Sequence, residues 1–141
     1  MYTGYLLSDD SRELLASIFP PKNPTWLGHH ITEVFGVQAN HPAPEEPEIV
    51  QVIGYAEQDG IEGFLVSIDG NTQRPKGGLY HITWSIDKSK GRKPFHTNKI
   101  IGDAERISPI NISVTPKTFT QSTEAEMRQP VQESFLAFLR K

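Results

Sequence analysis

The 141-residue sequence predicts an α+β domain made mostly of antiparallel strands, with about two main helices. Three observations favour this class. Short apolar segments alternate with turn signals, and the dipeptide Asp59-Gly60 between two such segments is typical of a hairpin. An amphipathic segment near the N-terminus has helical spacing. The tripeptide His-Ile-Thr occurs twice, each time in a strand-like segment, which suggests two similar lobes around a central cleft.

The composition indicates one globular domain spanning residues 1–141. Hydrophobic residues make up 36% and charged residues 22% of the chain, so a packed core is expected rather than disorder. The net charge of −3 argues against broad, sequence-independent binding to duplex nucleic acid. The chain has no cysteine, which excludes disulfides, thiolate catalysis and cysteine-based metal centres.

The sequence also predicts where the protein acts. The longest apolar runs fall well short of the roughly 18 residues of a membrane span, so no membrane partner is expected. The first residues lack the charged and then apolar layout of a signal peptide. We therefore expect a cytoplasmic protein without an obligate protein partner.

The first half of the chain predicts a strand, a helix and the first motif strand. The strand covers Tyr2–Leu7, and the first motif strand covers about 28–37. Between them, Ser8 to Ser11 offer helix N-caps, and Pro20-Pro21 ends the helix. The spacing of four residues predicts one apolar helix face: Leu14, Leu15, Ile18 and Phe19.

The second half predicts a hairpin, the second motif strand and two short strands before a final helix. In chain order these segments are 49–58, 61–69, 79–86, 99–101 and 110–115. The last helix is expected from Ser122 to Lys141, with Glu126 completing a capping box and Pro130 interrupting it.

The repeated tripeptide carries the strongest functional signal. Random shuffling of this composition would produce roughly 0.03 copies of His-Ile-Thr, so two copies are difficult to attribute to chance. Alternate residues of a strand share a face, so His30 lies beside Thr32 and His81 beside Thr83. Two imidazoles can act as acid and base, and two hydroxyls can donate to phosphate oxygens. This combination suits phosphodiester chemistry without a metal or other cofactor.

At these two motifs the sequence resembles the 2H phosphoesterases, or LigT-like group, named for two His-x-Ser/Thr motifs on strands of a bilobal α+β fold. The group includes cyclic phosphodiesterase domains of the tRNA-ligase type and phage and viral enzymes. The resemblance implies that His30 and His81 are the acid–base pair, and that Thr32 and Thr83 bind the phosphate. It further implies hydrolysis of a 2′,3′-cyclic phosphate at an RNA end, or of a small cyclic, 2′,5′- or 3′,5′-linked oligonucleotide. For hydrolysis, we favour His81 as the base and His30 as the acid.

Other residues are candidates for substrate binding. Aromatic rings stack on nucleobases, and cations hold additional phosphates. The stacking candidates are Tyr5 and Trp26, and the phosphate-binding candidates are Arg74, Lys76, Lys88, Lys90, Arg92 and Lys93. By strand alternation, Tyr80 and Trp84 are expected in the core. His29 is expected on the face opposite His30, with a structural role or as a residue that supports the site from behind. His41 and His96 lie in predicted loops.

Two alternatives to a 2H enzyme remain at this stage. A three-histidine zinc site is conceivable, but no His-x₃-His or His-Glu-x-x-His spacing occurs, so no metal site is predicted. The chain could instead be a non-catalytic module that binds RNA ends or nucleotides in the same cleft.

Overall fold

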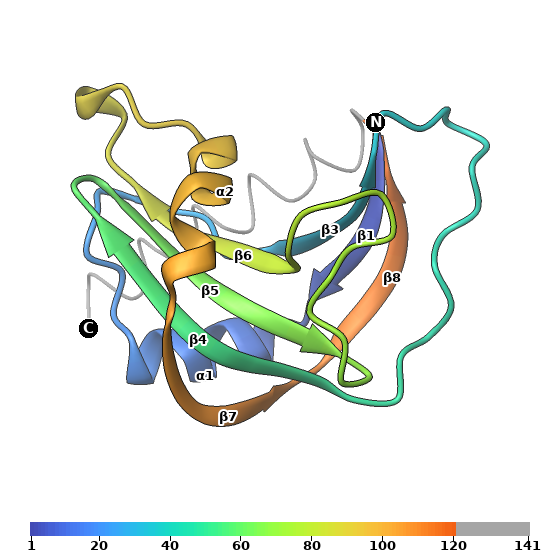
Figure 1. Ribbon diagram of the computed structural model, residues 1–141, viewed down its shortest axis with the longest axis horizontal. Helices are drawn as coiled ribbons and strands as arrows, with labels where there is room; N and C mark the ends of the chain where they lie inside the picture. Colours follow the sequence, from blue (N-terminus) through green and yellow to red (C-terminus); the bar gives the residue numbers. More distant parts are fainter. Residues whose placement is uncertain (121–141) are drawn as a thin grey trace.

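The computed structural model describes residues 1–120, which form an α+β domain with two antiparallel sheets and two α-helices (Figure 1). The predicted class is confirmed at this level. The smaller sheet has the order β3-β1-β8 and consists of β1 (Tyr2–Leu7), β3 (His30–Phe35) and β8 (Val114–Phe119). The larger sheet has the order β2-β6-β5-β4-β7 and consists of β2 (Thr25–Trp26), β6 (His81–Ile86), β5 (Ile61–Ile68), β4 (Val50–Gln58) and β7 (Glu105–Ile112).

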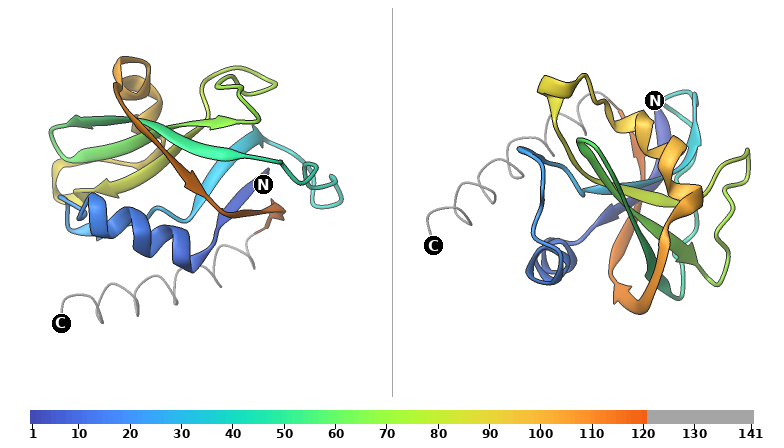
Figure 2. Two further views of the ribbon diagram at one scale, coloured as in Figure 1. Left: turned by 90° about the horizontal axis from the view of Figure 1, so that it is seen from below. Right: turned by 60° about the vertical axis from the view of Figure 1, so that its left-hand side comes forward.

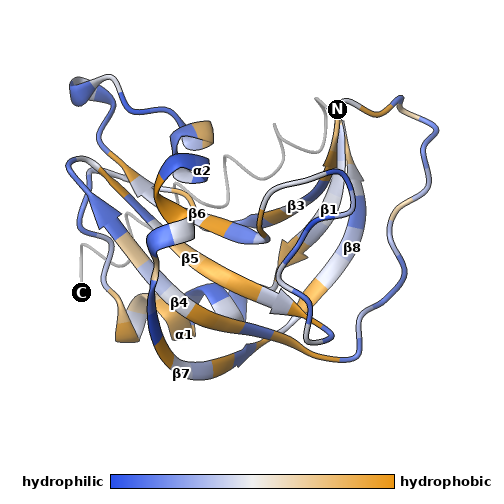
Figure 3. Ribbon diagram, in the orientation of Figure 1, coloured by the Kyte–Doolittle hydropathy of each residue, from blue (hydrophilic) through white to orange (hydrophobic). Residues whose placement is uncertain are grey.

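The helices lie on opposite faces of the larger sheet (Figures 1 and 2). They are α1 (Asp9–Ile18) and α2 (Thr97–Ile100), and three 3-10 turns accompany them: η1 (Lys88–Lys90), η2 (Pro94–His96) and η3 (Ile101–Asp103). Hydrophobic residues gather along the central strands β4 and β5, whereas the loop that contains η1 is mostly hydrophilic (Figure 3). Within the described residues, no helix is both long and apolar enough to cross a membrane.

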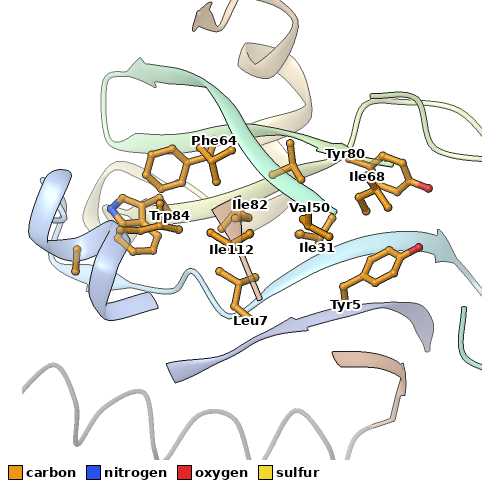
Figure 4. Packing of buried hydrophobic residues seen from close by; sticks show 14 of the residues in the cluster. Tyr5, Leu7, Ile31, Val50, Phe64, Ile68, Tyr80, Ile82, Trp84 and Ile112 are labelled. Carbon is orange, nitrogen blue, oxygen red and sulfur yellow. The ribbon is translucent and has the colours of Figure 1, made fainter. Parts of the chain in front are cut away.

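The main core fills the space between the two sheets. Tyr5 of β1 and Ile31 of β3 enter it from the smaller sheet, and Ile82 and Trp84 of β6 enter it from the larger sheet, with Tyr5 beside Tyr80 (Figure 4). Ile31, Ile82 and Trp84 are completely buried, as expected for residues that alternate with exposed positions along a strand. A second core lies on the other face of the larger sheet, under α2.

The N-terminus of α1 also ties the two sheets together. Ser113 is the one residue between β7 and β8, which belong to different sheets. Its carbonyl accepts the N–H of Ser8 at 2.9 Å, and its own N–H donates to Oγ of Ser11 at 2.7 Å. Ser8 caps the helix as predicted, by accepting the Ser11 N–H.

These contacts explain an error in the predicted helix face. The buried side chains of α1 are Ser11, Arg12, Leu15 and Ala16, whereas Leu14 and Ile18 are 45% and 49% exposed. The bond to Ser113 turns Ser11 inward and thereby rotates the apolar stripe partly toward solvent. The side chain of Arg12 packs inside the protein. Its guanidinium carbon lies 4.1 Å from the centre of the Trp26 ring, and a terminal nitrogen donates to the Leu27 carbonyl at 2.9 Å. Burial lowers the pKa of Arg12 to about 10.

Two of the short predicted strands differ from the structure. Residues 99–101 form the end of α2 and the start of η3 instead of a strand. A helical turn lets Ile100 and Ile101 reach the same core, whereas a strand would send them to opposite faces. The predicted strand 110–115 is divided at Ser113 between β7 and β8. The helix predicted for 122–141 lies outside the described residues.

A buried carboxylate holds the segment before β2 against the larger sheet. Glu62 of β5 is fully buried and accepts the backbone N–H of Lys22 at 2.7 Å. It also accepts the hydroxyls of Tyr55 and Ser85. Burial of a carboxylate is costly unless its oxygens accept hydrogen bonds, and these three donors provide them.

The two motif strands are joined at Gly28, where the smaller sheet meets the larger one. Its N–H donates to the carbonyl of Thr83 at 2.9 Å, next to the bond from Leu27 N–H to the Trp84 carbonyl. Gly28 has a φ of +70°, and a Cβ there would lie 2.4 Å from the Trp84 ring. Only glycine fits this combination of backbone conformation and close approach.

We therefore expect Gly28→Ala to destabilise the protein by about 3 kcal/mol, through a strained backbone and a clash with a fully buried ring. Gly36→Ala is the matched control: its φ is +79°, but no atom of residues 1–120 lies within 4 Å of the added Cβ. The control should lose only the backbone component, about 1 kcal/mol. Urea unfolding of both variants measures the difference, and equal losses would show that the contact with Trp84 is unimportant.

Candidate active site

Both His-Ile-Thr motifs line one cavity of about 620 Å³ at the junction of the two sheets. Its walls come from β3, β6, the loop before β6 and the turn η2. The lining residues are Tyr2, Leu27, Gly28, His29, His30, Thr32, Phe35, Arg74, His81, Thr83, Pro94, Phe95 and Asn98. Of the part of the chain that the structure describes, no Asp or Glu lines the cavity, which therefore favours an anion.

Strand alternation orients the motif residues as predicted. In β3, His30 and Thr32 are partly exposed and face the cavity, while Ile31 between them is buried in the core. In β6, His81 and Thr83 face the cavity and Ile82 is buried. The two motifs therefore present two imidazoles and two hydroxyls to the same space.

His30 is enclosed by aromatic rings. Its ring centre lies 5.0 Å from that of Tyr2 and 5.5 Å from that of Phe119. Its Nδ1 lies 2.7 Å from Nδ1 of His29. Burial lowers the pKa of His30 well below its ordinary value of 6.5, and the charges of His29 and His81 lower it further.

His81 is oriented by the backbone of its own strand entry. Its Nδ1 lies 2.8 Å from the carbonyl of Leu79. A carbonyl can only accept, so Nδ1 carries a proton and the lone pair of the neutral ring is on Nε2. Burial lowers the pKa of His81, the charge of Arg74 contributes in the same direction, and the bond to Leu79 opposes them.

The hydroxyl of Thr83 is already part of a hydrogen-bond chain. It lies 2.8 Å from the hydroxyl of the buried Thr97, and it donates to the Pro94 carbonyl at 3.2 Å. When Thr97 is the donor of this pair, the single proton of Thr83 is directed at the Pro94 carbonyl, and a ligand in the cavity receives it only by replacing that bond. The turn η2 and helix α2 therefore orient the second motif.

Of the six residues predicted to bind phosphate, Arg74 lines the cavity and the other five do not. Its Nε donates to the Gly77 carbonyl at 2.9 Å, which leaves the terminal nitrogens of the guanidinium for a ligand. Gly78, with a φ of +84°, packs against these nitrogens and would crowd them if it carried a side chain. Lys76 is exposed in the same loop and does not line the cavity.

The remaining basic residues lie beside the cavity rather than in it. Lys88, Lys90, Arg92 and Lys93 belong to the loop around η1 and are largely exposed. Lys90 pairs with Asp59 at 2.5 Å, and Nε of Arg92 donates to the Asp59 carbonyl at 2.7 Å. Both side chains are thus directed toward the hairpin between β4 and β5.

Tyr5 and Trp26, predicted to stack on a base, lie in the core. Tyr5 is 4% exposed, and it pairs with Ile31 across the β1–β3 ladder. Directly opposed residues share a face, so Tyr5 points into the core as Ile31 does. Trp26 is 5% exposed and packs edge-to-face on Trp84, with ring centres 5.6 Å apart.

The exposed aromatic rings of the cavity are instead Phe35 and Phe95, which are 75% and 58% exposed. Phe35 reaches this face because of a β-bulge: Thr3 and Gly4 are consecutive in β1, but they pair with Val34 and Thr32. The extra residue, Glu33, shifts the alternation by one position. A bulge has no reliable sequence signal, so strand alternation places Phe35 on the wrong face.

His29 also differs from its predicted position. It lines the cavity and stacks on His30, although alternation would separate the two rings. The reason is that β3 begins only at His30, and the left-handed conformation of Gly28 precedes it. In the sequence, the pair of adjacent histidines is the one feature that could have indicated a place for His29 in the cavity. Among residues 1–120, no three His, Cys, Asp or Glu side chains are grouped as metal ligands.

The lowered histidine pKa values predict how stability depends on pH. Below pH 6.5 the unfolded chain binds protons that the folded protein excludes from His30 and His81, so the free energy of unfolding rises with pH up to about 6.5 and falls as the pH decreases. Each ring contributes at most about 1.4 kcal/mol per pH unit within that window. Urea unfolding of ligand-free protein between pH 7.5 and 5 should show this loss, and His30→Gln should reduce it. An unchanged slope in the variant would contradict the assignment.

Comparison with known proteins leaves the identity of the chain open. We compared it with models of protein families, with curated protein sequences and with solved structures, and none of the three comparisons found a match. The function therefore has to be inferred from the cavity and the chemistry of the residues that line it.

Proposed function

We propose that this protein is a metal-independent phosphodiesterase of the 2H type. Its substrate is a 2′,3′-cyclic phosphate at an RNA end or a small cyclic, 2′,5′- or 3′,5′-linked oligonucleotide. The arrangement of one motif strand in each of two antiparallel sheets, with a cleft between them, supports the bilobal fold that such an enzyme requires.

One observation carries the proposal: both His-x-Thr pairs and Arg74 line the same cavity, and within residues 1–120 no carboxylate does. Two histidines on separate surfaces could not act on one bond. Here their charges are close enough for His81 to lower the pKa of His30. A bound phosphate anion would raise the pKa of both histidines, and would thus favour the protonated imidazole that burial disfavours.

The geometry of His81 suits the base. With Nδ1 donating to Leu79, neutral His81 presents the Nε2 lone pair and can accept a proton from an attacking water. The oxygen of that water forms the new bond to phosphorus as the bond to the leaving oxygen breaks. His30 then delivers a proton to the leaving oxygen, so one proton enters at His81 and one departs from His30.

The remaining polar groups of the cavity stabilise the charged phosphoryl group. The hydroxyls of Thr32 and Thr83 donate to its nonbridging oxygens, and the guanidinium of Arg74 neutralises part of the charge. With Thr97 donating to Thr83, the proton of Thr83 can leave the Pro94 carbonyl and donate to a phosphate oxygen.

The walls of the cavity favour a short nucleotide over a long RNA. Phe35 lies at the end of β3 and Phe95 in η2, so the exposed rings come from different parts of the fold. Aromatic faces stack on bases without sequence preference. Arg74 is the one Lys or Arg among the lining residues, which suits one or two phosphates better than an extended backbone.

Turnover in EDTA tests the function. The protein is incubated with a 2′,3′-cyclic nucleotide, an RNA ending in a cyclic phosphate, and cyclic and linear oligonucleotides. Hydrolysis of at least one of these in EDTA is expected. Binding without turnover would instead indicate a non-catalytic nucleotide-binding module, and activity that is lost on adding EDTA would indicate a metal-dependent reaction.

Removal of either motif histidine should abolish most of this turnover. We expect His30→Ala and His81→Ala each to lower kcat by about 10²- to 10⁴-fold, because each removes a proton-transfer group. Thr32→Val should cost less, because it removes a single donor and leaves both histidines. His41→Ala, in the exposed segment between β3 and β4, is the control and should retain full activity. Comparable kcat values in His30→Ala and wild type would refute the mechanism.

The aromatic walls should affect binding more than chemistry. Phe35→Leu and Phe95→Leu keep an apolar side chain but remove the ring, and each should raise KM for nucleotide substrates about 5- to 100-fold, as expected for loss of a base stack. A cyclic phosphodiester that lacks a base is the control substrate, and its KM should be unaffected. Equal effects on both substrates would argue against base stacking.

A further inference from the structure

His29 forms a short polar contact with the candidate acid–base residue His30. The two Nδ1 atoms lie 2.7 Å apart, and the rings are stacked with centres 4.7 Å apart and planes inclined by 24°. His30 has aromatic neighbours on its other sides, namely Tyr2 and Phe119. The contact with His29 is therefore a specific polar interaction within an apolar surrounding.

Proton counting limits the states of this pair. Two nitrogens at 2.7 Å need one proton between them, because two lone pairs or two N–H groups would repel each other. A charged imidazole carries protons on both nitrogens, so the two rings cannot be charged at the same time. The pair therefore binds at most one additional proton, as a unit.

His81 has a different kind of partner. The carbonyl of Leu79 only accepts, so the Nδ1 proton of His81 stays where it is. His29 can both donate and accept. The Nδ1 proton of His30 can consequently move to His29 while the rest of the pair remains hydrogen-bonded.

We propose that His29 is a positioning residue for His30, fixing its ring through the shared Nδ1 proton so that Nε2 faces the substrate. This rests on the proposed function. When Nε2 of His30 gains a proton, the Nδ1 proton passes to His29 and the charge leaves the ring enclosed by Tyr2 and Phe119. When Nε2 gives its proton to the leaving oxygen, the Nδ1 proton returns and both rings are neutral again.

Nuclear magnetic resonance of the ligand-free, ¹⁵N-labelled protein tests the pairing directly. A proton shared between two nitrogens produces a scalar coupling between the two Nδ1 nuclei, which a mere ring contact does not. We expect this coupling in the wild type and its loss in His29→Asn and His29→Phe. Wild-type protein without the coupling would overturn the proposal, whether or not the protein hydrolyses a phosphodiester.

Kinetics of the same variants test the role in catalysis. His29→Phe keeps the ring but offers no nitrogen, and kcat should fall about 10- to 100-fold with KM little changed, as for other partners that orient a functional histidine. The side-chain oxygen of His29→Asn can accept from Nδ1 of His30 and should restore most of kcat. A change in KM alone would make His29 a cavity wall and overturn the proposal.

Controls show whether a negative result comes from misfolding of a variant, from the absence of phosphodiesterase activity, or from an incorrect role for His29. His41→Phe makes the same substitution outside the cavity and should leave kcat and the coupling intact. Thermal unfolding of each variant identifies loss of structure. If His29→Phe is destabilised, the kcat of His29→Asn decides: recovery supports the proposal, and no recovery overturns it. Coupling in a wild type that hydrolyses no substrate supports the pairing and counts against the phosphodiesterase function alone.

Discussion

The bond from the Gly28 N–H to the Thr83 carbonyl fixes the relation between the two halves of the site. It joins the residue that leads into the first motif to the last residue of the second. The Trp84 ring packs where a side chain at position 28 would lie, and Arg12 holds the Leu27 carbonyl from the other side. The main-chain bond at Gly28 and the buried Trp84 ring therefore fix the position of one motif relative to the other, and with it the separation of the two imidazoles.

The environment of the site also explains why two chemically identical motifs need not act alike. His81 donates to a backbone carbonyl, whose role is fixed, whereas His30 faces a second imidazole, whose role can change. Burial lowers the pKa of both rings, so this environment favours their neutral forms. An incoming phosphate then meets Arg74 and two hydroxyls before either histidine needs to be charged.

Much of this arrangement could be predicted from the sequence because it depends on local rules. Strand alternation placed both His-x-Thr pairs on one face and Tyr80 and Trp84 in the core, and β1 has the predicted bounds. The errors arise where one residue interrupts a local rule. The left-handed Gly28 brings His29 beside His30, and Ser113 turns α1 so that Leu14 is exposed. A bulge also moves Phe35, for which no position is predicted, to the cavity. Each of these depends on a contact between segments distant in the sequence, which no periodicity reveals.

The crossing at Ser113 has a consequence for how a ligand enters. A single residue carries the chain from one sheet to the other, and its carbonyl and N–H are both bonded to the start of α1. Within residues 1–120, four segments join the two sheets, and two of them, Ser113 and residues 27–29, are too short to act as hinges. The longer connections, through α1 and through residues 36–49, therefore cannot by themselves let the sheets move apart. A binding site held in this way is preorganised, so the protein loses little conformational entropy when a ligand binds. Its selectivity then depends on the shape that the cavity has before binding.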